Sequence, residues 1–184
     1  MKAFTPVCTT EIIGFAKANT YFKKLNTELI GLSIDSNASH LAWLNDIFEK
    51  TGTYVPFPII ADRNGEIARK YGMISNDVSK TETVRNVFII DDKGIIRLIL
   101  VYPMQIGRSI SEILRVLEAL QTADNCKVAT PLNWYPGNPA IQYSPTTFDG
   151  LQKRQQEILE DRNGMSWYLS FKDVSTCEKK SKIE

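Results

Sequence analysis

Apolar positions along the chain follow two kinds of spacing, and each kind predicts a different element. Helical spacing predicts four helices, over residues 12–24, 36–52, 65–71 and 109–121. Short continuous apolar runs predict three strands, over residues 28–35, 84–91 and 94–101. Two prolines between residues 54 and 62 exclude helix there and predict extended chain. The polar stretch 75–82 predicts a loop.

Turn and cap residues indicate where several of these elements end. The stretch from Asp91 to Gly94 is a strong hairpin signal between the last two strands. Asn37 or Ser39 can cap the start of the second helix, and Gly72 ends the short third helix. The order strand, helix, strand, short helix, hairpin, helix predicts an α/β core built in layers.

The pattern changes after residue 122. Pro, Asn and aromatic residues crowd the stretch 127–139, which has little regular spacing. Beyond it we predict a polar helix, a short strand and a disordered tail, over residues 147–162, 167–171 and 178–184. We therefore expect two regions, a core over residues 1–122 and a C-terminal arm over residues 123–184.

Composition and charge narrow the range of functions. The 43% share of hydrophobic residues is ordinary for a globular chain, and no apolar stretch is long enough to cross a bilayer. A formal net charge of +1 gives no reason to expect nucleic acid or a membrane as a partner. The first residues lack the apolar segment of a signal peptide.

The cysteines indicate the redox compartment. Cys8, Cys126 and Cys177 are odd in number and widely spaced. This fits a reducing compartment and one reactive thiol better than a secreted disulfide framework, so we expect a cytoplasmic protein. The sequence has no CxxC pair and no metal-ligand spacing, and its one histidine, His40, would have to serve any Cys–His pair.

Cys8 is the strongest candidate for chemistry. It directly precedes the first predicted helix, where unpaired N–H groups and the positive end of the helix dipole favour thiolate over thiol. Thr5, Thr9 and Thr10 could donate hydrogen bonds to this sulfur or to a molecule bound beside it. The alternative is a buried structural cysteine, since free cysteines are usually buried as small apolar residues.

Two arginines and a glutamate are candidates to support this thiol. Arg85 begins a predicted strand, and Arg108 opens the last core helix. A guanidinium beside Cys8 would lower the pKa of the thiol and donate hydrogen bonds to a bound oxygen. Glu11, one turn along from Cys8, could hold such an arginine in place. The alternatives are solvated surface arginines and a first-turn acid that complements the helix dipole.

The stretch Phe-Thr-Pro-Val-Cys-Thr-Thr-Glu at residues 4–11 resembles the active-site signature of peroxiredoxins, specifically of the peroxiredoxin-6-like (1-Cys) subfamily. Further segments resemble that subfamily in order and spacing. They are residues 31–36, 39–43, 56–62, 84–91, 102–108 and 128–134. The resemblance therefore covers nearly the whole chain.

The resemblance implies a thioredoxin-like fold with a C-terminal extension. It also implies a thiol-dependent peroxidase that reduces hydrogen peroxide and organic hydroperoxides. Cys8 would be the peroxidatic cysteine, which attacks a peroxide oxygen and becomes a sulfenic acid. Thr5 would orient the peroxide, and Arg85 would stabilise the thiolate and the charge that develops on the oxygens. Glu11 and Arg108 would complete the supporting network.

The resemblance also implies partners. It implies no metal and no organic cofactor, and it implies an external thiol reductant, which could be thioredoxin-like, glutathione or another small thiol. The C-terminal arm would build a homodimer or a higher oligomer. Animal members also have a phospholipase activity that needs a serine motif, and this sequence lacks that motif, so we do not expect the activity here.

The sequence departs from the subfamily at its start. The family has a proline seven residues before the reactive cysteine, where this sequence has Met1. We therefore expect an N-terminally truncated version of the fold that lacks the usual first strands. The alternative function is a non-catalytic or inactive fragment that acts at most as a dimerisation or holdase-like module.

The sequence also departs from some microbial members, which carry a resolving cysteine in the arm. Here the neighbourhood of Trp167 has none, and Cys177 lies slightly farther along as a candidate resolving cysteine. Cys126 is expected to be a bystander. The default is a one-cysteine cycle with an external thiol. A third reading, a disulfide-exchanging oxidoreductase, is disfavoured because CxxC is absent.

Overall fold

The computed structural model describes residues 1–74, 85–175 and 177. The chain divides into two compact units, unit 1 over residues 1–114 and unit 2 over residues 115–184. Helix α4 (Ile110–Cys126) runs through the boundary between them. The boundary predicted after residue 122 also falls inside this helix, and the assignment of domains stays a prediction.

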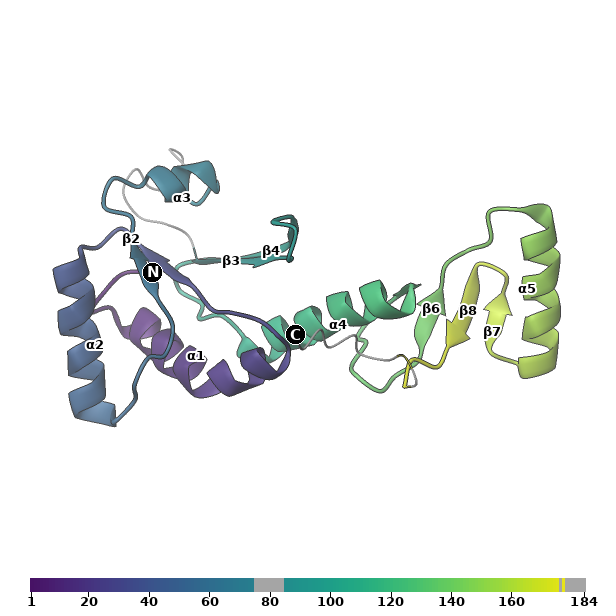
Figure 1. Cartoon of the computed structure of the whole chain (residues 1–184), viewed down its shortest axis with the longest axis horizontal. Helices are drawn as coiled ribbons and strands as arrows, with labels where there is room; N and C mark the ends of the chain where they lie inside the picture. The colour runs from purple at the N-terminus through teal and green to yellow at the C-terminus, as the bar shows by residue number, and fades with distance from the viewer. Residues whose placement is uncertain (75–84, 176, 178–184) are drawn as a thin grey trace. The chain divides into compact units, whose positions relative to one another are not determined.

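Unit 1 is a mixed α/β unit (Figure 1). Its elements are α1 (Pro6–Lys24), β1 (Gly31–Ser33), α2 (Asn37–Thr51), β2 (Ile59–Ala61), α3 (Glu66–Lys70), β3 (Arg85–Ile90), β4 (Ile96–Tyr102) and the first turn of α4. Strands β1 and β2 pair in parallel and are joined through α2. Strands β3 and β4 form the predicted antiparallel hairpin, with Arg85 opposite Tyr102. The strand predicted over 28–35 is shorter in the structure.

Helix α1 starts earlier than its apolar spacing predicts. It begins at Pro6 instead of residue 12, because proline is preset for the first helical position and lacks the N–H that would be unpaired there. Cys8 therefore lies inside the first turn of α1 and not before the helix. The positive end of the helix dipole still acts on it.

Helix α2 begins and ends within one residue of its predicted bounds, but its N-terminal capping residue differs from the two predicted candidates. Ser36 is the N-cap, and its hydroxyl accepts the N–H of Ser39 at 3.2 Å, so neither Asn37 nor Ser39 is the cap. Gly52 ends the helix with φ 67°, a left-handed conformation that glycine adopts readily.

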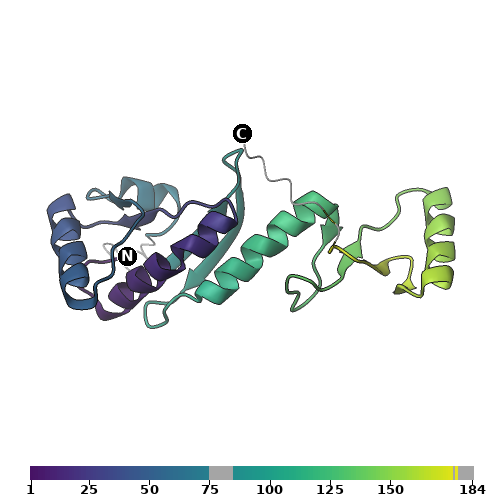
Figure 2. The ribbon, with the colours of Figure 1, turned by 60° about the horizontal axis from the view of Figure 1, so that its bottom comes forward.

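The core of unit 1 near Cys8 forms where α1 meets α2, and the two helices lie side by side (Figure 2). Cys8 and Ile12 are one turn apart on α1, and Trp43 and Ile47 are one turn apart on α2. These four side chains are buried together with Ala3. The spacing of four residues puts each pair on one helix face, which explains why both faces are buried.

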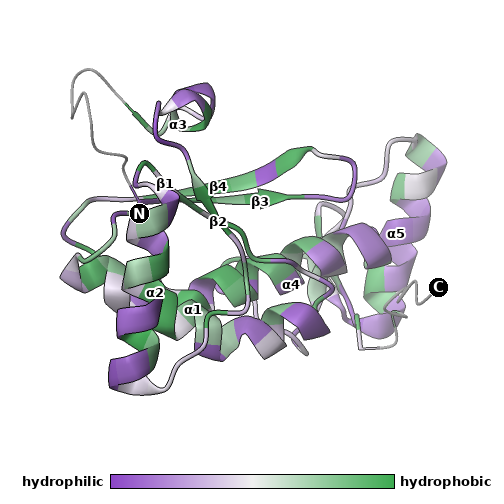
Figure 3. Cartoon of the chain, turned by 60° about the vertical axis from the view of Figure 1, so that its left-hand side comes forward, coloured by the Kyte–Doolittle hydropathy of each residue, from purple (hydrophilic) through white to green (hydrophobic). Residues whose placement is uncertain are grey.

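Strands β3 and β4 are apolar along most of their length (Figure 3). Their continuous apolar runs are the reason that the sequence predicts them. Ile96, Ile99 and Val101 of β4 remain exposed in this single chain. The predicted loop over 75–82 lies outside the described residues.

Unit 2 has more regular structure than its sequence predicts. After α4 come β5 (Val128–Ala129), β6 (Ala140–Gln142), α5 (Phe148–Asp161), β7 (Gly164–Ser166) and β8 (Leu169–Lys172). The strands form one antiparallel sheet in the order β5-β6-β8-β7. Helix α5 matches the predicted polar helix, and α4 extends beyond its predicted end at residue 121. The predicted disorder of 178–184 lies outside the described residues.

The core of unit 2 is a small apolar cluster. Cys126, Val128, Trp134, Ala140 and Val174 are its main members. Cys177 packs against this cluster and forms a disulfide with Cys126, with 5.7 Å between their Cα atoms. Cys126 is thus paired and not an isolated thiol, because the end of α4 and the segment after β8 meet in this cluster, and its expected place as a bystander to the peroxidase cycle stays a prediction. Within the described part of the chain, no helix is both long and apolar enough to span a membrane.

Candidate active site

Cys8 lines a small cavity in unit 1 of about 120 Å³, together with Thr5, Ile34, Arg85 and Met104. Its side chain is 2% exposed. Among the described residues it is the free cysteine. A cavity of this size next to a buried thiol admits small molecules and excludes large ones.

The sulfur of Cys8 accepts hydrogen bonds from two groups. Lys2 donates its backbone N–H at 3.4 Å, and Arg85 donates Nη1 at 3.1 Å. Burial alone raises the pKa of the Cys8 thiol, but the nearby Thr5 hydroxyl, the hydrogen bonds from Lys2 and Arg85 and the charge of Arg85 outweigh it. The pKa of Cys8 is therefore lowered below its ordinary value, and the thiolate is favoured.

Glu11 joins both arginines to α1. Its carboxylate accepts Arg85 Nη1 at 3.0 Å on one oxygen. Arg108 donates to Glu11 through Nη2 at 2.6 Å, Nε at 3.0 Å and its backbone N–H at 2.9 Å. Further bonds run from Arg85 Nε to the Met104 carbonyl at 2.9 Å and from Arg108 Nη1 to the Asn86 carbonyl at 3.2 Å. Both guanidinium groups are therefore held by several bonds each.

Charge pairing keeps this buried network ionised. Glu11 is 5% exposed and Arg85 6% exposed. Burial raises the pKa of Glu11, yet the hydrogen bonds and charge of Arg108, with the charge of Arg85, lower it overall. Glu11 is thus a carboxylate, and it offsets part of the positive charge of the arginines without contacting the sulfur in any bond described here. The guanidinium of Arg85 remains directed at Cys8.

The structure brings the five predicted residues Thr5, Cys8, Glu11, Arg85 and Arg108 together, although Arg85 is 77 residues from Cys8 along the chain. Arg108 precedes α4 and does not open it, because the helix begins at Ile110. Thr5 is the N-cap of α1, but its hydroxyl donates to the Lys2 carbonyl at 2.8 Å and does not cap the helix.

Other residues depart from expectation. The hydroxyls of Thr9 and Thr10 donate to the carbonyls of Thr5 and Val7 and not to the sulfur. The backbone N–H of Lys2 was missed as a donor to Cys8, and a main-chain donor leaves no signal in residue types. Cys177 lies in unit 2 with Cys126, and its role as a resolving cysteine stays a prediction.

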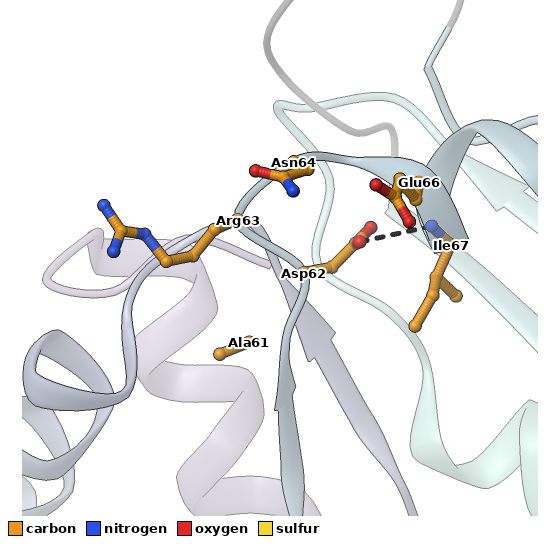
Figure 4. A pocket seen from close by; sticks show the side chains of 6 residues that line it. All are labelled: Ala61, Asp62, Arg63, Asn64, Glu66 and Ile67. Atoms are coloured by element: carbon orange, nitrogen blue, oxygen red, sulfur yellow. Dashed lines mark hydrogen bonds between the residues drawn. The ribbon is translucent and has the colours of Figure 1, made fainter.

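A second hollow in unit 1 lies at the start of α3 (Figure 4). Asp62 dominates it, but its carboxylate accepts the N–H groups of Ile67 at 3.1 Å and Ala68 at 2.8 Å. The carboxylate is therefore engaged with the first N–H groups of α3. Within the described ranges, no group of three or more His, Cys, Asp or Glu residues is arranged to hold a metal ion.

Family models match both parts of the chain. The model of the AhpC/TSA family matches residues 1–99, and the model of the C-terminal domain of 1-Cys peroxiredoxin matches residues 119–157. The chain belongs to the peroxiredoxin family.

Relatives of known sequence agree with this assignment. The peroxiredoxin is 53% identical over 171 residues to Peroxiredoxin 2 of Caldanaerobacter subterraneus subsp. tengcongensis, covering 93% of this chain and 77% of that one. It is 50% identical over 181 residues to Peroxiredoxin of Aquifex aeolicus, covering 93% of this chain and 80% of that one.

Solved structures of 1-Cys and peroxiredoxin-6 proteins are similar as well. A yeast mitochondrial 1-Cys peroxiredoxin superposes with a TM-score of 0.80 at 39% identity, over 94% of this chain and 82% of that one. Peroxiredoxin 6 of Arenicola marina superposes with a TM-score of 0.78 at 33% identity, over 95% and 84%. The expected thioredoxin-like peroxiredoxin fold of 1-Cys type is confirmed. This peroxiredoxin is a thiol-dependent peroxidase, and the non-catalytic alternative is not favoured.

Proposed function

We propose that this peroxiredoxin reduces hydrogen peroxide and organic hydroperoxides through a sulfenic acid at Cys8. The observation that carries the proposal is the 3.1 Å hydrogen bond from Arg85 Nη1 to a sulfur that is 2% exposed. A buried sulfur with a guanidinium donor is arranged to be a thiolate, and the thiolate is the nucleophilic form. The small cavity beside it limits access to small oxidants.

The proposed reaction is a displacement at oxygen. The thiolate of Cys8 attacks the terminal oxygen of R–O–O–H, a sulfur–oxygen bond forms and the O–O bond breaks. Cys8 becomes a sulfenic acid, and the leaving R–O⁻ takes up a proton to give water or an alcohol. Sulfur is oxidised and the peroxide is reduced by two electrons.

Arg85 and Thr5 have separate proposed roles in this step. Arg85 stabilises the negative charge that develops on the oxygens as the O–O bond breaks. Its bonds to Glu11 and to the Met104 carbonyl keep the guanidinium in one orientation, so little reorganisation is needed during the reaction. Thr5 lines the cavity and orients the peroxide through its hydroxyl. Glu11 and Arg108 are supporting residues.

An external thiol would complete the cycle. The family uses peroxide substrates and thiol reductants such as thioredoxin or glutathione. The yeast mitochondrial 1-Cys peroxiredoxin has a thiol resolving mechanism via glutathione and thioredoxin systems, which supports an external thiol here too. The thiol condenses with the sulfenic acid, which releases water, and a second thiol then frees Cys8. A homodimer and a cytoplasmic location remain part of the proposal.

The test is the fate of each cysteine after a small excess of hydrogen peroxide. Mass spectrometry with a sulfenic-acid trap should find rapid modification at Cys8 and none in the Cys8→Ser variant, which should also lose turnover with an added thiol. Slow oxidation spread equally over the three cysteines would contradict the proposal.

A further inference from the structure

A chain of hydrogen bonds runs from α2 to the residue that caps α1. Trp43 of α2 donates its indole Nε1–H to Thr9 Oγ1 at 3.0 Å. The Thr9 hydroxyl donates in turn to the Thr5 carbonyl at 2.8 Å. The backbone N–H of Thr9 donates to the same carbonyl at 2.9 Å. The Thr5 carbonyl is thus held by two bonds from one residue.

Which group donates in each of these hydrogen bonds follows from the chemistry of the indole and the hydroxyl. An indole N–H can only donate, so the Thr9 oxygen must accept it, and the single hydroxyl proton of Thr9 is left for Thr5. Trp43 is 1% exposed and lies in the apolar cluster between α1 and α2. A buried N–H without an acceptor is costly, so the indole holds the Thr9 hydroxyl in this one orientation.

Thr5 in turn organises the groups on the sulfur. Its backbone is extended, with φ −106° and ψ 142°, and its hydroxyl donates to the Lys2 carbonyl at 2.8 Å. The N–H of Lys2 donates to Cys8 at 3.4 Å. Residues 2–5 therefore form a short bend over Cys8, which is fixed at two points: the Ala3 N–H donates to Asp35 Oδ2 at 2.8 Å, and the Thr5 carbonyl accepts the two bonds from Thr9.

We propose that Thr9 and Trp43 are positioning residues of the peroxidase site, which hold the Thr5 peptide so that the Lys2 N–H stays directed at Cys8 and the Thr5 side chain keeps its place in the cavity beside the sulfur. Neither residue is assigned a contact with the peroxide. This inference rests on the proposed function, in which Cys8 is the nucleophile and Thr5 orients the substrate.

Two substitutions remove the link, Thr9→Val with almost no change of shape and Trp43→Phe with some loss of buried volume. Thr9→Val replaces the hydroxyl by a methyl, and Trp43→Phe removes the N–H but keeps an aromatic ring. In each variant the second-order rate constant for Cys8 oxidation should fall about ten- to a hundredfold, because a small misplacement of reacting groups has effects of this order. Thr9→Ser keeps the hydroxyl and should restore the wild-type rate.

The pH dependence of Cys8 alkylation separates positioning from mere stability. Thr9→Val and Trp43→Phe should move its midpoint to higher pH, because the Lys2 N–H that donates to the sulfur at 3.4 Å lowers the pKa of Cys8. The other charged or titratable groups that face this region are Glu11, Asp35, His40, Arg85, Arg108 and the Met1 amino group, and none of them bonds to Thr9 or Trp43 in the contacts described. Thr9→Ser should leave the midpoint unchanged.

Thr51→Val is the matched control. The Thr51 hydroxyl also donates to a carbonyl four residues back, Ile47 at 2.7 Å, and accepts the Thr53 N–H at 3.2 Å, but at the far end of α2. Thermal unfolding should show similar destabilisation in Thr9→Val and Thr51→Val and a larger one in Trp43→Phe, with loss of rate only in Thr9→Val and Trp43→Phe. In the double variant the loss should be no greater than in either single variant, since both break one chain of bonds.

Two outcomes would overturn the inference, and they differ from failure of the proposed function. If Cys8 of the wild type is the rapidly oxidised thiol but Thr9→Val and Trp43→Phe keep its rate and pH midpoint, Thr9 and Trp43 only stabilise the fold. The same conclusion follows if Thr51→Val loses as much rate as they do. If wild-type Cys8 is itself not selectively oxidised, the proposed function fails first.

Discussion

The two units place cysteine in opposite surroundings. Cys8 of unit 1 is 2% exposed and Cys126 of unit 2 is 6% exposed, so burial is nearly the same. Cys8 receives hydrogen bonds from a guanidinium and a backbone N–H. Cys126 lies among apolar side chains and is bonded to Cys177. Burial therefore does not decide what a cysteine does, and its charged and hydrogen-bonding partners do.

Helix position strengthens this contrast. Cys8 lies in the first turn of α1, near the positive end of the helix dipole, whereas Cys126 is the last residue of α4, near the negative end. The first position favours a thiolate and the second disfavours it. Unit 1 thus keeps one thiol in a reactive form, and unit 2 has its two cysteines in a structural bond.

The largest expected effect is the loss of stability when Glu11 is replaced. Glu11→Gln leaves two buried arginines without their carboxylate, and removal of one partner from a buried ion pair costs about 3–5 kcal/mol. Urea unfolding of unit 1 should report a loss in this range. An unchanged midpoint would mean that the arginines find other partners when Glu11 is gone.

Loss of Arg85 should remove the special property of Cys8 itself. Arg85→Met takes away the charged donor at 3.1 Å from the sulfur, and removal of one such donor slows a reaction by about 10²–10³-fold. Stopped-flow oxidation of Cys8 by hydrogen peroxide measures this rate. Arg97→Met is a control, because Arg97 pairs with Asp91 at the hairpin. Equal rates in both variants would contradict the role of Arg85.

In unit 2 the expected effect is on stability and not on rate. Cys126→Ser opens the disulfide that closes 51 residues of sequence, and loss of a disulfide of this kind costs about 2–4 kcal/mol. Thermal unfolding should show a lower midpoint, whereas Cys8 oxidation should keep its rate. If Cys177 instead resolves Cys8, a disulfide between Cys8 and Cys177 should form after addition of peroxide. Peptide mapping would detect that disulfide.

The smallest expected effect is a shift in pH. Because the pKa of Cys8 is lowered in the folded state, its alkylation should reach half its maximal rate at lower pH than that of an unfolded thiol. The thiolate then stabilises the fold above the unfolded pKa, and this contribution disappears as pH falls through the folded pKa. Alkylation in native buffer and in urea compares the two states. Identical midpoints would show that the network does not act on the sulfur.

The sequence predicts most of unit 1 because its longer helices and its hairpin are strongly patterned. Helix α2 and the β3–β4 hairpin follow their apolar spacing and turn residues closely. The start of α1 at Pro6 was missed, because apolar spacing begins only after the first turn. Strands β5, β6 and β7 were missed because they have two or three residues each, which is too short for alternation to show.

The candidate site also has features that the sequence predicts and features that it does not. Its charged side chains could be predicted by residue type, and the resemblance around residues 4–11 indicated which ones to choose. The bond from Trp43 to Thr9 joins residues 34 apart, and no spacing rule predicts it. The pairing of Cys126 with Cys177 could not be derived either, since cysteine positions alone do not determine connectivity.

The network around Glu11 also has a consequence for the state that follows oxidation. Two guanidinium groups, one carboxylate and one thiolate sum to zero net charge, and the neutral sulfenic acid leaves an excess of one positive charge. The site is therefore more positive by one charge while it awaits a reductant than it is before oxidation. A thiol in its anionic form is the species that such an excess attracts, so oxidation itself prepares the site for its next reactant.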